Sequence, residues 1–82
     1  MIASSWSSSI PPLPVISGRR CVAALSKAGF TLVRQRGSHM LVQRVAPATT
    51  LSVPDHNELD RGTLRAIIRQ AGLTVEEFLG LL

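Results

Sequence analysis

Two histidines are the side chains of this sequence best suited to proton transfer near neutral pH. His39 follows a Gly-Ser pair at the expected start of a strand, and His56 lies in an Asp/Asn-rich loop over residues 54–58. An imidazole can donate or accept a proton at physiological pH, as general acid–base catalysis requires. On residue type alone, a lone histidine near a strand end is more often structural or merely exposed. His39 is therefore the candidate catalytic residue, with a structural role as the alternative.

Arginines surround His39 in the sequence. Arg34, Arg36 and Arg44 belong to the two strands expected on either side of the Gly-Ser pair. A guanidinium binds phosphate through parallel hydrogen bonds, and the Ser38 hydroxyl offers one more. Cleavage of an RNA phosphodiester needs a base for the 2′-hydroxyl, cations for the charged phosphorane and an acid for the leaving 5′ oxygen. These residue types suit RNA cleavage by a route that requires no metal.

Other candidate residues have competing interpretations. His56 is a second proton-transfer group, a residue that stabilises its own loop, or neither, and the loop composition favours a structural role. Arg61, Arg65 and Arg69 are four residues apart on an expected helix, so they form a basic stripe that contacts phosphate or is simply solvated. Cys21 falls on the apolar face of an expected helix, which favours the core over a nucleophile. No metal-ligand spacing is present, so neither a metal nor a cofactor is expected.

Charge and length limit the class of protein. The 82 residues carry nine Lys and Arg against five Asp and Glu, a formal net charge of +4. Residues 17–54 hold six of the cations and no acid. This basic half indicates a polyanionic partner or, alternatively, a solvated basic surface. A chain this short forms one domain with two layers of secondary structure, which suits a surface groove better than a deep pocket.

The single cysteine, the lengths of the apolar runs and the N-terminal residues indicate the cellular compartment. One cysteine cannot form an intramolecular disulfide and fits a reducing cytoplasm. No apolar run approaches the roughly 20 residues of a membrane-spanning helix, so no membrane association is expected. Residues 1–14 are rich in Ser and Pro and lack positive charge, which argues against a signal peptide. We interpret them as a disordered leader or an uncertain start, and residues 15–82 as the single domain.

The elements that position these side chains follow from apolar spacing and cap residues. A helix is expected to begin after Ser17, with an apolar face of Cys21, Val22, Leu25 and Ala28, and to end at Gly29. Two strands, residues 30–36 and 39–44, flank the Gly-Ser pair as a tight hairpin, and a short third strand covers residues 50–53 before Pro54.

Two further helices complete the expected order. Asp60 caps a helix whose apolar stripe is Leu64, Ile67, Ile68 and Ala71, and Gly72 ends it. Thr74 and Glu77 form a capping box for a last short helix. The resulting order α-β-β-β-α-α predicts an α+β fold in which helices cover one sheet face and the other face is free to meet a ligand.

Several short motifs follow one another along residues 15–82 in a specific order. They are Val15-Ile16-Ser17-Gly18, Ala28-Gly29-Phe30, the run from Val33 to His39, Val53-Pro54 with His56, the run from Gly62 to Leu73, and Glu76 to Leu79. In order and spacing they resemble the HicA (YcfA-like) toxin family. The resemblance implies a fold like that of double-stranded-RNA-binding domains, α-β-β-β-α with a three-stranded antiparallel sheet, and here an extra short C-terminal helix.

The resemblance also implies a function. HicA toxins are ribosome-independent mRNA interferases, and the histidine of their Gly-Ser-His motif, which corresponds to His39, is catalytic. A HicB-type antitoxin protein binds the toxin and blocks that surface, so a hetero-oligomer with the antitoxin and a monomeric free toxin are expected in the cytoplasm. Met40 departs from the family pattern, in which His or an aromatic often follows the motif.

Two alternatives to an endoribonuclease are retained. A non-catalytic RNA-binding module would use the same arginines for shape recognition and would not need a titratable ring at position 39. An interaction subunit would only capture a partner protein. The expected site consists of His39 as catalytic residue, His56 as a secondary candidate, and an RNA-binding set of Ser38, Arg34, Arg36, Arg44 and Arg65.

Overall fold

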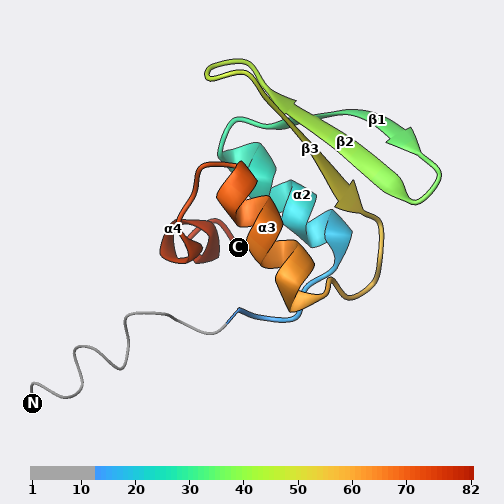
Figure 1. Cartoon of the computed structure of the whole chain (residues 1–82), viewed down its shortest axis with the longest axis vertical. Helices are drawn as coiled ribbons and strands as arrows, with labels where there is room; N and C mark the ends of the chain where they lie inside the picture. The colour runs from blue at the N-terminus through green and yellow to red at the C-terminus, as the bar shows by residue number, and fades with distance from the viewer. Residues whose placement is uncertain (1–12) are drawn as a thin grey trace, which may run out of the picture.

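The computed structural model describes residues 13–82, which form a helix, an antiparallel three-stranded sheet and two more helices (Figure 1). The elements are α2 (Gly18–Lys27), β1 (Thr31–Arg36), β2 (His39–Arg44), β3 (Thr49–Pro54), α3 (Arg61–Gln70) and α4 (Val75–Leu79). This order confirms the predicted α+β class and the α-β-β-β-α-α arrangement of a fold like that of double-stranded-RNA-binding domains.

The helix ends are the ones that the cap residues predicted. The Ser17 hydroxyl accepts a hydrogen bond from the Arg20 N–H at 3.0 Å, and Asp60 accepts from two N–H groups at the start of α3. Thr74 and Glu77 form both bonds of the capping box at the start of α4. Gly29, with φ of 97°, follows the end of α2 in the left-handed conformation that glycine adopts without strain.

The sheet has the order β1-β2-β3, so β2 is central and the other two strands are edges. A bulge between Leu32 and Arg34 shifts the register of β1 on β2. β3 runs one residue further at each end than predicted and includes Pro54. A proline is tolerated at this position because β3 is an edge strand. On its outer side there is no neighbouring strand, so no backbone hydrogen bond of the sheet is lost where proline lacks an N–H.

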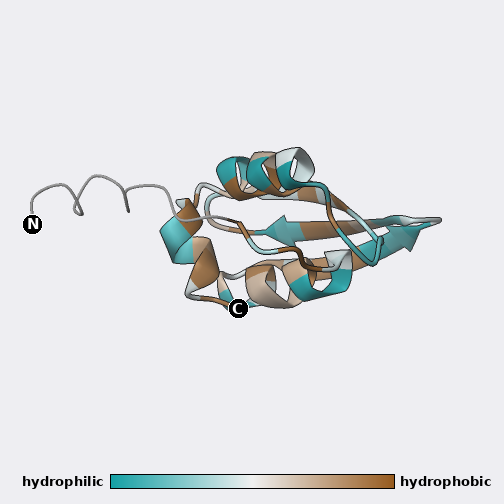
Figure 2. Cartoon of the chain, turned by 90° about the horizontal axis from the view of Figure 1, so that it is seen from below, coloured by the Kyte–Doolittle hydropathy of each residue, from teal (hydrophilic) through white to brown (hydrophobic). Residues whose placement is uncertain are grey.

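The core lies between the helices and one face of the sheet. Both α2 and α3 contact the sheet on this face, and in Figure 2 apolar and hydrophilic segments alternate along the elements, as amphipathic packing requires. The sheet contributes Met40, Val42, Leu51 and Val53 to the buried core. The predicted α3 stripe is completely buried, and α2 also buries Ala24, which the sequence pattern did not single out.

Leu13, next to the predicted domain boundary, packs into the core. It is 4% exposed, although the sequence placed it at the end of the leader. The division into a leader over residues 1–14 and a domain over residues 15–82 stays a prediction. The rest of the predicted leader, residues 1–12, lies outside the described residues.

Gly18 lies where the start of α2 meets the end of β3 and the loop that follows it. Its N–H donates to the carbonyl oxygen of His56 at 2.8 Å, and the Leu59 N–H donates to the Ile16 carbonyl at 2.8 Å. A Cβ atom on residue 18 would overlap the carbonyl oxygen of Pro54. The φ of Gly18 does not lie in the left-handed region, so the backbone conformation itself does not require glycine. Glycine is needed because a side chain would not fit between the two backbone segments.

We therefore expect Gly18→Ala to lower the free energy of unfolding by about 2–3 kcal/mol, because backbone atoms must move to relieve the overlap. Gly80→Ala is the matched control, since a Cβ there would make only ordinary contacts at 3.5 Å and beyond. Urea unfolding followed by circular dichroism measures both. Equal stability of the two variants would contradict this account of Gly18.

Candidate active site on the open sheet face

His39 is the first residue of β2 and points away from the helices. Its neighbours in the strand, Met40 and Val42, are buried against the helices, and side chains alternate along a strand. His39 therefore lies on the opposite side, which we call the open face of the sheet: His39, Leu41 and Gln43 of β2 with their cross-strand neighbours. His39 itself is exposed.

Arg36 and Arg34 share the open face with His39. In the register of β1 on β2, Arg36 is directly opposite His39, and Arg34 is opposite Leu41. Directly opposite residues have Cβ atoms about 5 Å apart and diagonal ones about 7–8 Å apart, so both guanidinium groups can reach a ligand held at His39. The exposed Ser38 precedes His39 in the turn. Four of the predicted site residues thus come together on one exposed surface.

Arg44 lies on the other face. Its guanidinium carbon is 4.6 Å from the centroid of the Phe30 ring, and its nitrogens donate to the Pro47 carbonyl and the Thr49 hydroxyl, both at 3.3 Å. Because Arg44 is five positions after His39, an odd step along the strand, the alternation of side chains puts the two on opposite faces. Arg44 closes the end of the core at the β2–β3 hairpin and is not brought to His39.

Arg65 and His56 are also apart from the open-face group. Arg65 is exposed on α3, in the helix layer. The carbonyl of His56 accepts the bond from Gly18, and within residues 13–82 its exposed imidazole makes no hydrogen bond. The buried Cys21 has a thiol pKa raised to about 12 by burial, so the thiol is neutral and belongs to the core, as predicted.

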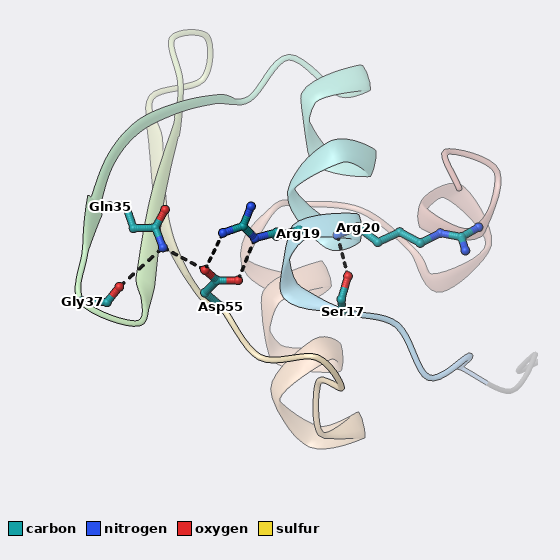
Figure 3. Close-up of polar contacts among 6 residues, drawn as sticks. All are labelled: Ser17, Arg19, Arg20, Gln35, Gly37 and Asp55. Carbon is teal, nitrogen blue, oxygen red and sulfur yellow. Dashed lines mark hydrogen bonds and ion pairs between the residues drawn. The ribbon is translucent and has the colours of Figure 1, made fainter.

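Asp55 is a residue of this region that the sequence did not single out. Its carboxylate accepts hydrogen bonds from Arg19 of α2, at 3.2 and 3.3 Å, and from the side-chain amide of Gln35 in β1, at 2.8 Å (Figure 3). Its backbone N–H donates to the Ser38 carbonyl at 2.6 Å. These partners lie 36, 20 and 17 residues away in the chain, so no local pattern could have revealed them.

Arg44→Lys is expected to lower the free energy of unfolding by about 0.5–1 kcal/mol, because lysine keeps the charge and loses the planar contact with Phe30. Arg34→Lys, an exposed position whose side chain makes no hydrogen bond within the described residues, serves as the control and should change stability by less than about 0.5 kcal/mol. Chemical denaturation gives both values. A larger effect at Arg34 than at Arg44 would refute the assignment of the two faces.

The Asp55 carboxylate should make stability depend on pH. Hydrogen bonds from Arg19 and then Gln35 hold its pKa below the usual value of about 3.9. A carboxyl whose pKa is lowered by folding stabilises the fold above its unfolded-state pKa, and this stabilisation is lost as pH falls through the folded-state pKa. We expect the stability difference between wild type and Asp55→Asn to be constant near neutrality and to shrink below about pH 4. A difference that does not vary with pH would contradict this.

Within residues 13–82, no three His, Cys, Asp or Glu side chains lie close enough together to hold a metal ion. Among the helices of this part of the chain, none combines the length and the apolarity needed to cross a bilayer.

Residues 18–73 match the family model described as HicA toxin of bacterial toxin-antitoxin. None of the curated proteins compared matches the chain. The matched segment extends from the first residue of α2 through the sheet and α3, and it includes the Gly-Ser-His turn of the open face. Because the match covers more than half of the chain, this protein belongs to the HicA family, the toxins of toxin–antitoxin systems, which implies an antitoxin partner.

Proposed function

We propose that this protein is an mRNA interferase whose catalytic residue is His39, acting without a ribosome or a metal ion. The observation that carries the proposal is the register pair of Arg36 and His39 on an exposed sheet face, with Arg34 on the diagonal. A titratable ring beside two guanidinium groups is the set of groups that RNA phosphodiester transfer needs. The family membership supports the same function.

The proposed chemistry uses these side chains in separate roles. The imidazole of His39 takes the proton of a ribose 2′-hydroxyl, and the 2′ oxygen bonds to phosphorus as the bond to the 5′ oxygen breaks. Arg36 and Arg34 bind the non-bridging oxygens and stabilise the charge that develops on them, and Ser38 adds a hydrogen bond. The leaving 5′ oxygen takes a proton from a general acid that the open-face group does not include, and His56, which lies apart from that group, stays the secondary candidate for this role. The products are a 2′,3′-cyclic phosphate and a 5′-hydroxyl.

The proposed partner is a HicB-type antitoxin that covers the open face and so blocks access of RNA to His39. Apolar side chains of the edge strand β1 support a protein contact along the edge of the sheet, since Leu32 is 47% and Val33 51% exposed; Leu32 pairs with Val42 and so lies on the helix side of this edge. The complex is a hetero-oligomer, the free toxin is a monomer, and both act in the cytoplasm, where mRNA is available.

His39→Ala is expected to abolish cleavage of a labelled mRNA by at least about a hundredfold, since general acid–base catalysis contributes roughly 10²–10⁴-fold. The assay uses antitoxin-free protein, excess EDTA and no ribosomes, and circular dichroism checks that the exposed substitution leaves the fold intact. Equal cleavage by wild type and variant would refute the role of His39. RNA binding without cleavage by either protein would favour the non-catalytic RNA-binding module instead.

Replacing both Arg34 and Arg36 by glutamine should weaken RNA binding and flatten its salt dependence. Each lost phosphate contact lowers the slope of log K against log salt by about 0.7 for a single strand. Arg65→Gln is the comparison in the helix layer, and its slope should remain that of wild type. A slope that changes for Arg65→Gln and not for the double variant would move the RNA surface from the sheet to α3.

A further inference from the structure

The turn that precedes His39 extends beyond the end of the neighbouring strand β3. His39 is opposite Pro54, the last residue of β3, so the next pair in this register is Ser38 with Asp55. The Asp55 N–H forms this extra rung to the Ser38 carbonyl at 2.6 Å. Within residues 13–82, it is the one hydrogen bond that ties residues 37–38 to anything outside their own hairpin.

The Asp55 side chain strengthens the same attachment. Its Oδ2 accepts from the Gln35 amide at 2.8 Å, and that amide also reaches the Gly37 carbonyl at 3.5 Å (Figure 3). The Arg19 guanidinium bonds the carboxylate from the opposite side, through two nitrogens at 3.2 and 3.3 Å. The Asp55 side chain is only 18% exposed, whereas that of Arg19 is 75% exposed. The carboxylate thus joins β1 to α2, and the Gln35 amide that it binds also reaches the hairpin turn.

The carboxylate does not share the open face with His39. Gln35, which it binds, pairs with Met40, and Met40 is buried on the helix side of the sheet. Its other partner, Arg19, belongs to α2, which covers that side. Asp55 therefore holds the backbone of the turn from the helix side of the sheet. An RNA phosphate bound on the open face would lie on the opposite side.

We infer that Asp55 is a positioning residue for His39, which fixes the turn of residues 37–38 so that the imidazole meets the scissile phosphate in a productive orientation. The inference rests on the proposed function. Loss of this support lowers kcat and leaves the affinity for RNA unchanged, because Arg34 and Arg36 remain in place on β1. Misplacing a catalytic group by about 1 Å can reduce the rate roughly a hundredfold.

The kinetic test compares Asp55→Ala with Glu58→Ala, a matched control that removes an exposed carboxylate of the same loop. We expect Asp55→Ala to lower kcat about 10- to 100-fold while the RNA Kd stays within about twofold of wild type. Glu58→Ala should leave both near wild type. Assays run well below the melting temperature of each variant, so that unfolded protein does not lower kcat. Asp55→Asn, which keeps the size and can still bond Gln35, should be intermediate and provides a folded variant if alanine is not tolerated.

A second readout does not depend on activity. In RNA-free protein, Asp55→Ala should speed amide hydrogen exchange at residue 55 and lower the backbone order parameters of residues 37–39, while amides in α3 stay protected. An unchanged turn, or equal losses in kcat and in RNA affinity, would overturn the inference even if wild type cleaves RNA. If wild type does not cleave RNA, the proposed function fails, and the exchange measurement still decides whether Asp55 holds the turn.

Discussion

Gly18 donates its backbone N–H to the His56 carbonyl, and its lack of a side chain lets the Pro54 carbonyl sit against the first turn of α2. This contact fixes the end of β3 against the helix layer. The end of β3 in turn fixes the start of β2, because Pro54 pairs with His39 and the Asp55 N–H donates to the Ser38 carbonyl. The position of the candidate catalytic ring is therefore set by a backbone approach between segments almost forty residues apart in the sequence.

The two faces of the sheet divide the polar residues into those that hold the fold and those that are free for a ligand. On the helix side, Arg44 packs on Phe30 and Arg19 bonds Asp55, so these guanidinium groups already have partners. On the open face, Arg34 and Arg36 have no side-chain hydrogen bonds within the described residues and remain available to phosphate. Arginines on the helix side thus take part in packing and hydrogen bonding, whereas those on the open face are exposed.

Local rules predicted most of the fold. The caps at Ser17, Asp60 and Thr74 and the apolar stripe of α3 were correct because each depends on neighbours within a few residues. The grouping of the candidate site was predicted only in part, since Arg44 was placed beside His39 without applying strand alternation. Asp55 was missed, and so was the burial of Leu13, because both depend on contacts between distant segments.

The central claim, that the open face cleaves RNA by transfer to the neighbouring 2′ oxygen, is tested most directly by the chemistry of the cut ends. A short RNA that the protein cleaves at one position should yield a 2′,3′-cyclic phosphate and a 5′-hydroxyl, identified by mass spectrometry. The same RNA with a single 2′-deoxyribose 5′ to that bond should not be cut there. A 5′-phosphate product, or unchanged cleavage of the 2′-deoxy substrate, would mean that water and not the ribose attacks, and would contradict the account.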